Sequence, residues 1–327
     1  MRVLVTGAAG FIGSNLVDRL LSNGHSVIGL DNLQTGSLRN LEHALMSNSF
    51  NFENVDIRDL DELKSISKNI EAILHLGALA DIVPSIDYPE DYFSVNVVGT
   101  FNVMQVARYV KAKRFIYIAS SSCYGVPKTF PTPESANIDP RYPYALTKYL
   151  GERIAMHWGE VYEIPTISLR LFNVFGPRAR TSGSYGAVFG VFLAQKLAGL
   201  PFTVVGDGTQ TRDFTYVSDV VDAIVTAMES RSNGIYNVGS GNTYSINKLI
   251  ELLSGKAVYI PKRPGEPDCT YADISKITKE LGWSPKVSFE DGVQLMLKHI
   301  KDWSGAPIWS QDSIAKATEN WFRYIKD

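Results

Sequence analysis

The sequence predicts an α/β protein in which a doubly wound parallel sheet carries a smaller C-terminal α/β lobe. Three observations predict it. A short β-branched run, Arg2–Thr6, ends at a glycine-rich turn and leads into an amphipathic stretch. Strand-like and helix-like segments then alternate to about residue 171, and this alternation loosens afterwards. Alternation of this kind predicts parallel strands with right-handed crossovers, whose ligands bind beyond the carboxyl ends of the strands.

The first unit is a strand, a glycine turn and a helix, which is typical of a Rossmann-type dinucleotide-binding fold. The glycines of the turn are Gly7, Gly10 and Gly13. They permit the tight turn, the close approach of a pyrophosphate and the packing of helix Ile12–Asn23 on the strand. The second strand, Ser26–Leu30, ends in Asp31, whose carboxylate can accept from both hydroxyls of an adenosine ribose. Because that carboxylate repels a 2′-phosphate, NAD is expected rather than NADP.

Further strands and helices follow in alternation. The expected strands are Phe50–Val55, Glu71–Leu76, Lys113–Ala119 and Thr166–Leu171, and the expected helices are Leu60–Ile70, Tyr92–Val110 and Tyr144–Val161. Between them, Val126–Pro143 is proline-rich and predicts a loop long enough to fold over a ligand.

Beyond residue 171 a smaller lobe is expected. The helices expected beyond that point are Ala187–Ala198, Ser218–Glu229 and Ser245–Leu253, and the strands are Pro201–Val205 and Ala257–Ile260. We expect residues 1–171, with a returning segment near 213–240, to form the NAD-binding domain. Residues 172–212 and 241–327 should then form the substrate-binding lobe. The tail, Trp303–Asp327, carries Ile314, Ala317, Trp321 and Ile325 at helical spacing. This spacing predicts a helix packed on the lobe, with a partner surface as the alternative.

Composition excludes several classes of function. With 45% apolar residues, 20% charged residues and a net charge of −2, the chain has no basic field to hold nucleic acid. Cys123 and Cys269 cannot make a disulfide framework, and the five histidines lack metal-ligand spacing, so no metal is expected. The longest apolar candidate, Ala187–Leu200, is too short to span a membrane. We therefore expect a cytoplasmic protein with no membrane partner.

The stretch from Ala119 to Tyr149 carries the candidate chemistry. Ser120 lies at the carboxyl edge of the predicted sheet, and Tyr144 and Lys148 lie one helical turn apart on one face. A cation beside the phenol is expected to lower the pKa of the tyrosine toward neutral pH. The residues expected to bind the cofactor are Gly7, Gly10, Phe11, Ile12, Gly13, Asp31, Asn32, Asp56, Ile57, Leu76, Ala78, Ala80, Asn96, Tyr144 and Lys148.

Motifs along nearly the whole chain resemble one family, the extended short-chain dehydrogenases that act on nucleotide sugars. The motifs are TGAAGFIG, ASSSCYG, YALTK, RLFNVFGP, GDGTQTRDFTYV, RPGEP and ADISKITKELGW. The resemblance implies that Ser120 and Tyr144 grip the sugar hydroxyl and that Lys148 holds the nicotinamide ribose. The residues that it places at the substrate are Ser121, Ser122, Asn173, Val188, Thr203, Val205, Arg212, Arg263 and Thr270. The two arginines suit a diphosphate because a guanidinium is a permanently charged, bidentate donor.

The segment after Ser120 distinguishes the reactions of that family. All begin with removal of the proton from the sugar 4-hydroxyl by Tyr144 while hydride passes from C4 to NAD. Dehydratases of the family then use an aspartate-glutamate pair, and decarboxylating relatives usually a glutamate, where this chain has Ser121 and Ser122. These hydroxyls resemble the serine-rich segment of the UDP-hexose 4-epimerases, so we expect a 4-epimerase. A 4,6-dehydratase and a non-catalytic NAD-binding regulator are the alternatives.

Three further expectations follow. Cys123 is interpreted as a buried apolar side chain, with a catalytic thiol as the alternative. Thr270 is small enough to leave room for an N-acetyl group at sugar C2, so plain hexoses, N-acetylated hexoses and uronic acids are all retained as substrates, and UDP is expected from the frequency of that nucleotide in the family. The helices Tyr92–Val110 and Tyr144–Val161 match those through which relatives dimerise, which predicts a homodimer built on a four-helix bundle.

Overall fold

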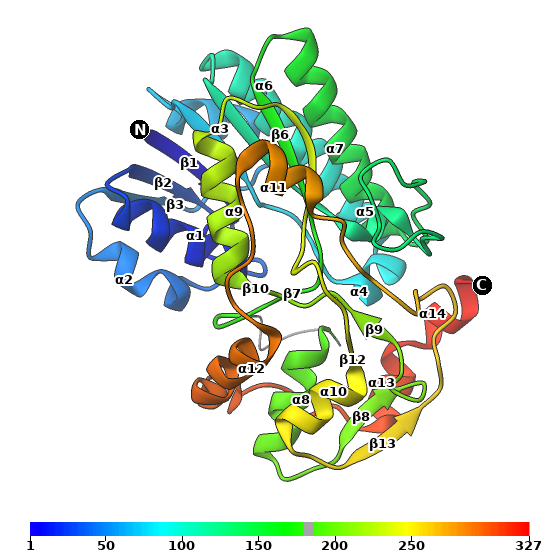
Figure 1. The fold of residues 1–327 in the computed structure, drawn as a ribbon. Coiled ribbons are helices and arrows are strands. Elements are labelled where there is room, and N and C mark those ends of the chain that lie inside the picture. The colour runs from blue at the N-terminus through cyan, green and yellow to red at the C-terminus, as the bar shows by residue number, and fades with distance from the viewer. Residues whose placement is uncertain (180–185, 327) are drawn as a thin grey trace.

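The computed structural model describes residues 1–179 and 186–326, and within these residues seven strands form one parallel sheet (Figure 1). The strands are β1 Arg2–Thr6, β2 Ser26–Leu30, β3 Phe50–Glu53, β4 Ala72–His75, β5 Arg114–Ser120, β6 Thr166–Leu171 and β11 Gly234–Val238. Their order across the sheet is β11-β6-β5-β4-β1-β2-β3. The predicted doubly wound parallel sheet is therefore confirmed. β1 and β4 are neighbours at the point where the order reverses, which is where such sheets bind ligands.

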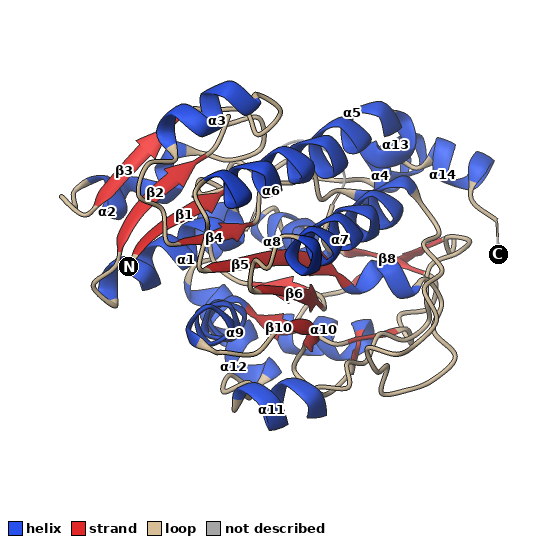
Figure 2. Ribbon diagram, turned by 90° about the horizontal axis from the view of Figure 1, so that it is seen from above, coloured by secondary structure: helices blue, strands red, loops and turns tan. Residues whose placement is uncertain are grey.

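Helices cover both faces of the sheet (Figure 2). These helices are α1 Phe11–Ser22, α3 Leu60–Ile66, α6 Thr100–Tyr109, α7 Pro143–Val161 and α9 Val217–Glu229. Alternate residues of β1 face opposite layers: Val3 and Val5 pack in the cluster that contains α1 and α9, whereas Leu4 packs in the cluster that contains α3 and α6. Both faces of the strand are thus buried, which explains why it reads as an unbroken apolar run.

Three segments of the sheet domain differ from the prediction by more than one residue at an end. Helix α3 ends at Ile66 rather than at residue 70, because Ser67 leaves the helical conformation with ψ of 39°. The strand predicted to end at Val55 ends at Glu53. The helix predicted from residues 92 to 110 is composite, consisting of α5 Pro89–Phe93, a π-helical turn Ser94–Gly99 and α6.

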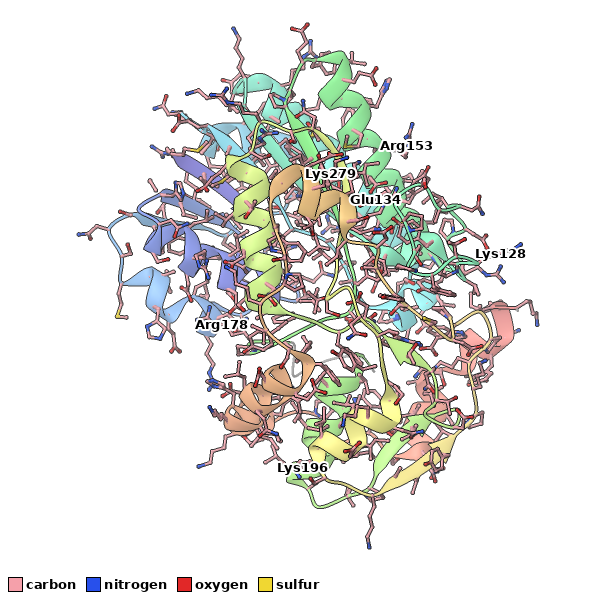
Figure 3. All side chains as sticks on the ribbon, viewed as in Figure 1. Lys128, Glu134, Arg153, Arg178, Lys196 and Lys279 are labelled. Carbon is pink, nitrogen blue, oxygen red and sulfur yellow. The ribbon has the colours of Figure 1, made fainter. Side chains whose placement is uncertain are left out.

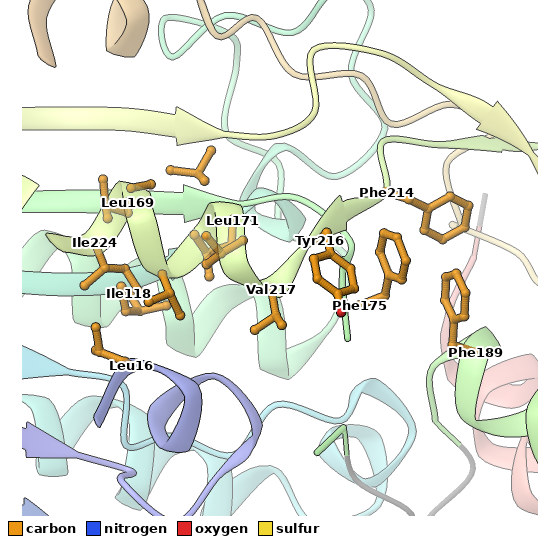
Figure 4. Packing of buried hydrophobic residues seen from close by; sticks show 14 of the residues in the cluster. Leu16, Ile118, Leu169, Leu171, Phe175, Phe189, Phe214, Tyr216, Val217 and Ile224 are labelled. Carbon is orange, nitrogen blue, oxygen red and sulfur yellow. The ribbon is translucent and has the colours of Figure 1, made fainter. Parts of the chain in front are cut away.

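The C-terminal lobe packs below the sheet in Figure 1. Its elements include α8 Val188–Leu197, β8 Phe202–Val205, α10 Ile246–Leu253, β13 Ala257–Ile260, α12 Phe289–Lys298, α13 Gln311–Ala317 and α14 Glu319–Tyr324. Phe175 stacks on Phe189 at 4.5 Å between ring centroids, and Phe214 stacks on Phe289 at 5.0 Å. Figure 4 shows that this aromatic cluster continues the core formed by Leu171 and the sheet residues, so lobe and sheet share one core.

The 126–142 loop is packed against the lobe. The backbone N–H of Thr132 donates to the carbonyl of Tyr271, and the N–H of Asp273 donates to the carbonyl of Thr132. Figure 3 shows Lys128 projecting from the outer edge of this loop, whereas Glu134 lies toward the middle of the molecule. There the Glu134 carboxylate accepts from the backbone N–H of Asn237 at 2.8 Å.

The division into domains stays a proposal. The segment 213–240 supplies α9 and β11 to the sheet, which supports assigning it to the NAD-binding domain with residues 1–171. In the part of the chain that the structure describes, no helix has the length and apolar character needed to cross a membrane.

Candidate active site

The glycine turn after β1 is shaped for close approach. Gly7 has φ of +68°, and a Cβ added to it would lie 2.8 Å from the backbone nitrogen of Gly77. A Cβ on Gly13 would lie 2.0 Å from the carbonyl oxygen of Gly7, so only glycine allows α1 to meet the turn. Helix α1 begins after Gly10 with no side-chain cap and no acidic residue in its first turn. Its first N–H groups therefore suit a pyrophosphate.

Asp31 lies at the end of β2 and faces this turn. Its carboxylate accepts from the backbone N–H of Ala9 at 3.0 Å and from that of Leu33 at 2.8 Å. Burial raises the pKa of Asp31, and these two hydrogen bonds oppose the shift. A Cβ on Gly36 would lie 2.9 Å from both carboxylate oxygens, so the carboxylate is closely surrounded. The position and chemistry of Asp31 fit a ribose diol of NAD.

Asp56 is held by side chains from two directions. Arg58 donates to it through Nε at 2.9 Å and Nη2 at 2.7 Å, and Asn32 donates through Nδ2 at 2.9 Å. The hydrogen bond from Arg58 lowers the pKa of Asp56 to about 2. The remaining predicted cofactor residues lie at the same edge of the sheet: Phe11 and Ile12 in the first turn of α1, Ile57 after β3, and Leu76, Ala78 and Ala80 after β4.

A buried hydrogen-bond network connects the glycine turn to the long helical segment. The Thr6 hydroxyl accepts from the N–H of Gly77 at 3.0 Å and lies 2.7 Å from Nδ1 of His75. Nε2 of His75 lies 2.9 Å from the Thr100 hydroxyl, which donates to the carbonyl of Asn96. That hydroxyl must therefore accept from Nε2–H, which leaves Nδ1 to accept from Thr6. Burial lowers the pKa of His75 to about 3, so the imidazole is neutral.

Asn96 continues this network toward α7, the helix that carries Tyr144 and Lys148. It lies in the π-helical turn, is 1% exposed, and exchanges hydrogen bonds with both the N–H and the carbonyl of Leu79. Its amide also donates to the hydroxyl of Thr147 at 3.1 Å, and that hydroxyl donates to the carbonyl of Tyr144. The Asn96 side chain therefore braces the segment after β4 against α7.

The catalytic candidates come together where β5 ends against α7. Ser120 is the last residue of β5, and its hydroxyl accepts from the N–H of Ser122 at 3.2 Å and from the Ser122 hydroxyl at 2.9 Å. The Ser120 hydroxyl lies close enough to Tyr144 to lower the pKa of the phenol. Ser122, Ser120 and Tyr144 thus form a row of hydroxyls at the carboxyl edge of the sheet. Ser121 begins the short 3-10 turn that follows β5.

The expected lowering of the Tyr144 pKa by the neighbouring cation is wrong for this structure. Burial of the phenol raises its pKa, and Asp81 and Cys123 add to the rise. Lys148 is itself buried, and this lowers the pKa of its ammonium to about 7. Its Nζ lies 4.6 Å from the centroid of the Tyr117 ring. Desolvation, which residue spacing alone cannot reveal, therefore outweighs the electrostatic effect.

A buried ion pair, which the sequence analysis did not predict, joins α7 to β6. Glu152 on α7 receives two hydrogen bonds from Arg170 on β6, from Nε at 2.9 Å and from Nη2 at 2.6 Å. Ser168 donates to the same carboxylate, and Arg170 also donates to the Tyr124 hydroxyl. The negative charge of Glu152 raises the pKa of Lys148 and so opposes the effect of burial. Separated by 18 residues, the pair gives no local sequence signal.

Cys123 is 2% exposed and packs with Tyr124, Phe172 and Ala272. Burial raises the pKa of its thiol to about 12. A thiol with this pKa is protonated at neutral pH, so the apolar interpretation is favoured over the catalytic one.

The two arginines predicted to hold a diphosphate converge on one carboxylate. Arg212 donates to Oε1 of Glu266 at 3.2 Å, and Nε of Arg263 lies 3.8 Å from Oε2 of the same residue. Arg212 and Glu266 line a cavity of about 360 Å³ together with Val205 and Gln210. Glu266 was missed as a site residue, although it lies in the RPGEP motif.

A second cluster joins the strand edge to the lobe. The Thr270 hydroxyl donates to Oδ1 of Asn173 at 2.8 Å and accepts from the N–H of Asp213 at 3.0 Å. The fully buried Asp213 carboxylate accepts from the backbone N–H groups of Ser240 and Ala272, and burial raises its pKa to about 6. The cluster thus fixes the position of two predicted substrate residues.

Two other predicted substrate residues lie differently. The Thr203 side chain is buried and accepts from Nε2 of Gln195 at 2.9 Å, so its hydroxyl faces α8 rather than the cavity beside Val205. Val188 is the first residue of α8 and is partly exposed.

Comparison with known proteins places this geometry in a family. The sequence model of the NAD dependent epimerase/dehydratase family matches residues 3–239. A UDP-glucose 4-epimerase of Mycolicibacterium smegmatis is 36% identical over 92% of this chain and 99% of its own.

Solved structures with the same fold give the same assignment. UDP-glucose 4-epimerase from Thermotoga maritima, with UDP-glucose, is 34% identical over 92% of this chain and 99% of its own, with a TM-score of 0.87. UDP-glucuronic acid 4-epimerase from Bacillus cereus, with UDP-glucuronic acid and NAD, has the same identity and coverage and a TM-score of 0.86. A dTDP-glucose 4,6-dehydratase from Streptomyces venezuelae, with NAD bound, is 27% identical over 93% of this chain and 99% of its own, with a TM-score of 0.86. The chain therefore belongs to the NAD-dependent epimerase/dehydratase family of nucleotide-sugar enzymes, as its motifs predict.

Proposed function

We propose that this protein is a 4-epimerase of a UDP-activated hexose. The observation that carries the proposal is the row of hydroxyls where β5 ends against α7, in which Ser122 donates to Ser120 and the Ser120 hydroxyl lowers the pKa of Tyr144. Proton removal from one sugar hydroxyl needs a base and a hydrogen-bonding partner, and this row supplies both. Relatives named as 4-epimerases at about a third sequence identity support the same reaction.

The residues of the chain have separable roles in this reaction. When bound, NAD supplies the hydride acceptor in the first half-reaction and the hydride donor in the second. Tyr144 takes the proton from the sugar 4-hydroxyl and returns it after the keto sugar has turned over. Ser120 orients the hydroxyl and, by donating to the phenolate, stabilises it. Lys148, when charged, adds further electrostatic stabilisation of the phenolate. Arg212 and Arg263 hold the diphosphate while the sugar turns.

The structure also favours epimerisation over 4,6-dehydration. Dehydration needs an additional acid and base at sugar C5 and C6, and neither Ser121 nor Ser122 ionises near neutral pH. Cys123 is the remaining candidate in this segment. Burial raises the pKa of its thiol to about 12, so the thiol stays protonated at neutral pH and has no thiolate to act as a base.

The choice of sugar is tested with a panel of UDP-, dTDP-, GDP- and CDP-hexoses. Each is incubated with the purified protein without added reductant, and the products are identified by proton NMR and mass spectrometry. We expect a UDP-hexose to be converted into its C4 epimer at unchanged mass. The same experiment identifies the C2 substituent of the accepted sugar, beside which we expect Thr270 to lie with its hydroxyl bound to Asn173. A product lighter by one water would contradict the proposal and establish the dehydratase.

Cys123→Ser is expected to retain epimerase activity within about threefold, because the thiol is protonated and packs as an apolar side chain. The measurement is kcat for the sugar pair found with the panel. A small loss of stability, on the order of 1 kcal/mol, should accompany the buried hydroxyl. Loss of turnover in a variant that unfolds at the wild-type temperature would instead assign chemistry to the thiol.

We further propose that the protein forms a homodimer through the α5 to α7 surface. Phe93, Leu146 and Tyr109 are 50%, 45% and 65% exposed along these helices. Helices α6 and α7 pack side by side, so two copies can form a four-helix bundle. Light scattering should give about twice the chain mass of 36.2 kDa. Leu146→Glu should then lower this mass to that of one chain, while a wild-type monomer would contradict the proposal.

A further inference from the structure

The C-terminal strap is the segment of residues 304–326, which carries α13 and α14. The alignment with the Mycolicibacterium smegmatis enzyme covers 99% of that protein but 92% of this chain, so about 26 residues of this chain have no counterpart in it.

The C-terminal strap contacts both parts of the molecule. Figure 1 shows α14 beside α4 Ile82–Asp87, and the amide of Asn320 donates to Asp87 at 2.8 Å. Next to the catalytic helix, Arg141 donates to the carbonyl of Lys326 at 2.9 Å. On the lobe side, Ile325 packs against Gly265. A Cβ added to Gly265 would lie 2.8 Å from the Cγ2 methyl group of Ile325. The strap therefore spans from the sheet domain to the RPGEP loop.

Trp321 is the centre of this contact. It is 2% exposed, and its indole N–H donates to the carbonyl of Pro264 at 2.9 Å. The guanidinium of Arg263 lies 5.3 Å from the centroid of its ring, within the range of a cation–π interaction. The centroid of the Tyr142 ring, two residues before Tyr144, lies 5.8 Å from that of Trp321. One indole thus contacts the phosphate-binding loop and the start of the catalytic helix.

We propose that Trp321 is a positioning residue for the substrate diphosphate, acting through Arg263. The proposal rests on the proposed function, because it requires a nucleotide diphosphate at Arg263. The hydrogen bond to Pro264 fixes the backbone of the loop, and the indole ring restricts the guanidinium to one side. A preorganised arginine loses less rotamer freedom on binding than a free one, so the strap increases affinity for the diphosphate.

The surroundings support positioning over simple packing. Glu266 lies between Arg212 and Arg263, and the electrostatic effect of Glu266 reaches the hydroxyl of Tyr142, whose pKa is raised mainly by burial. Trp321 therefore borders the same charged cluster that is proposed to receive the phosphates.

A double-mutant cycle tests the inference by direct binding. The dissociation constant of UDP is measured by calorimetry for wild type, Trp321→Ala, Arg263→Ala and the double variant. We expect Trp321→Ala to weaken UDP binding about tenfold, which corresponds to about 1.4 kcal/mol. In the Arg263→Ala background the same change should have less than a twofold effect, because the two residues act through one interaction. Affinity for NAD should stay within twofold, which also reports that the variants are folded.

Turnover and two further variants complete the test. Trp321→Ala should raise KM about tenfold with kcat within twofold. Trp321→Phe retains a ring but loses the N–H, and should give an intermediate loss. Tyr324→Ala on the same helix, where Tyr324 is 58% exposed, should bind UDP as wild type does.

Two results would overturn the inference. The first is that Trp321→Ala binds UDP with wild-type affinity. The second is that Trp321→Ala still weakens UDP binding about tenfold in the Arg263→Ala background. Absence of binding of UDP, dTDP and GDP to the wild type would contradict the proposed function and, with it, this inference. The first two results leave the proposed function intact, so the two failures are distinguishable.

Discussion

Tyr144→Phe is expected to lower kcat about a thousandfold while leaving the binding of NAD and UDP within about threefold. The phenol of Tyr144 on α7 is the group beside Ser120 that we propose to exchange a proton with the sugar 4-hydroxyl, and the Ser120 hydroxyl lowers its pKa. Phenylalanine keeps the ring and its packing against Tyr92, whose centroid lies 6.5 Å away, but it removes the proton carrier. Interconversion of the UDP-hexose pair, followed by NMR, measures the loss.

Tyr149→Phe is the matched control, because it removes a hydroxyl from the same helix at a partly buried position. It should retain at least half of wild-type kcat. Since burial raises the pKa of Tyr144 above its usual value, the phenol stays mostly protonated at neutral pH, and wild-type kcat should rise as alkaline pH increases the phenolate fraction. The residual rate of Tyr144→Phe should lack this rise. Turnover by Tyr144→Phe near the wild-type rate would contradict the assignment, and absence of turnover in the wild type would favour the NAD-binding regulator.

Glu152→Gln is expected to lower the free energy of unfolding by about 3–5 kcal/mol. The substitution leaves the Arg170 guanidinium, whose side chain is 4% exposed, without a counter-charge in the core. It also turns an amide N–H₂ toward the donors of Arg170 and Ser168. Hydrogen bonds from Arg170 to Tyr124 and to the carbonyl of Glu134 remain, but they are neutral partners. Urea unfolding, monitored by circular dichroism, measures the change.

Glu160→Gln provides the control, because Glu160 lies on the same helix and is exposed. Its effect should stay below about 0.5 kcal/mol. A loss below about 1 kcal/mol in Glu152→Gln would show that the ion pair is not a main support of α7. Because Glu152 raises the pKa of Lys148, its neutralisation should also lower the charged fraction of that lysine near neutral pH.

The parts of the fold that were predictable have signals local to the chain. The bounds of β1, β2, β6 and β13 agree with the sequence analysis, because each is an apolar run of β-branched residues between polar or turn residues. β11 was not predicted as a strand, since Gly234 and Asn237 obscure its pattern and its strand conformation depends on pairing with β6. The tail was predicted to be helical, and Ile314 and Trp321 are buried as expected, but Thr318 separates two short helices.

The residues of the candidate site likewise fall into those with a local sequence signal and those that only tertiary packing brings together. Ser120, Tyr144 and Lys148 could be placed because a strand end and a helical turn bring them together. Glu152 and Arg170 could not, because only the packing of α7 on β6 joins them. The direction of the Tyr144 pKa shift was mispredicted for a related reason: desolvation depends on how many distant segments cover the phenol, and the chain order does not contain that information.

The network that runs from Thr6 through His75 and Asn96 to Thr147 has an evolutionary consequence. It makes the cofactor turn and the catalytic helix one mechanical unit, whose members lie in β1, β4, the π-helical turn and α7. The C-terminal lobe, which we propose to bind the substrate, lies outside this unit. Mutations that reshape the lobe are therefore expected to change the sugar that is accepted without disturbing the proposed oxidation step.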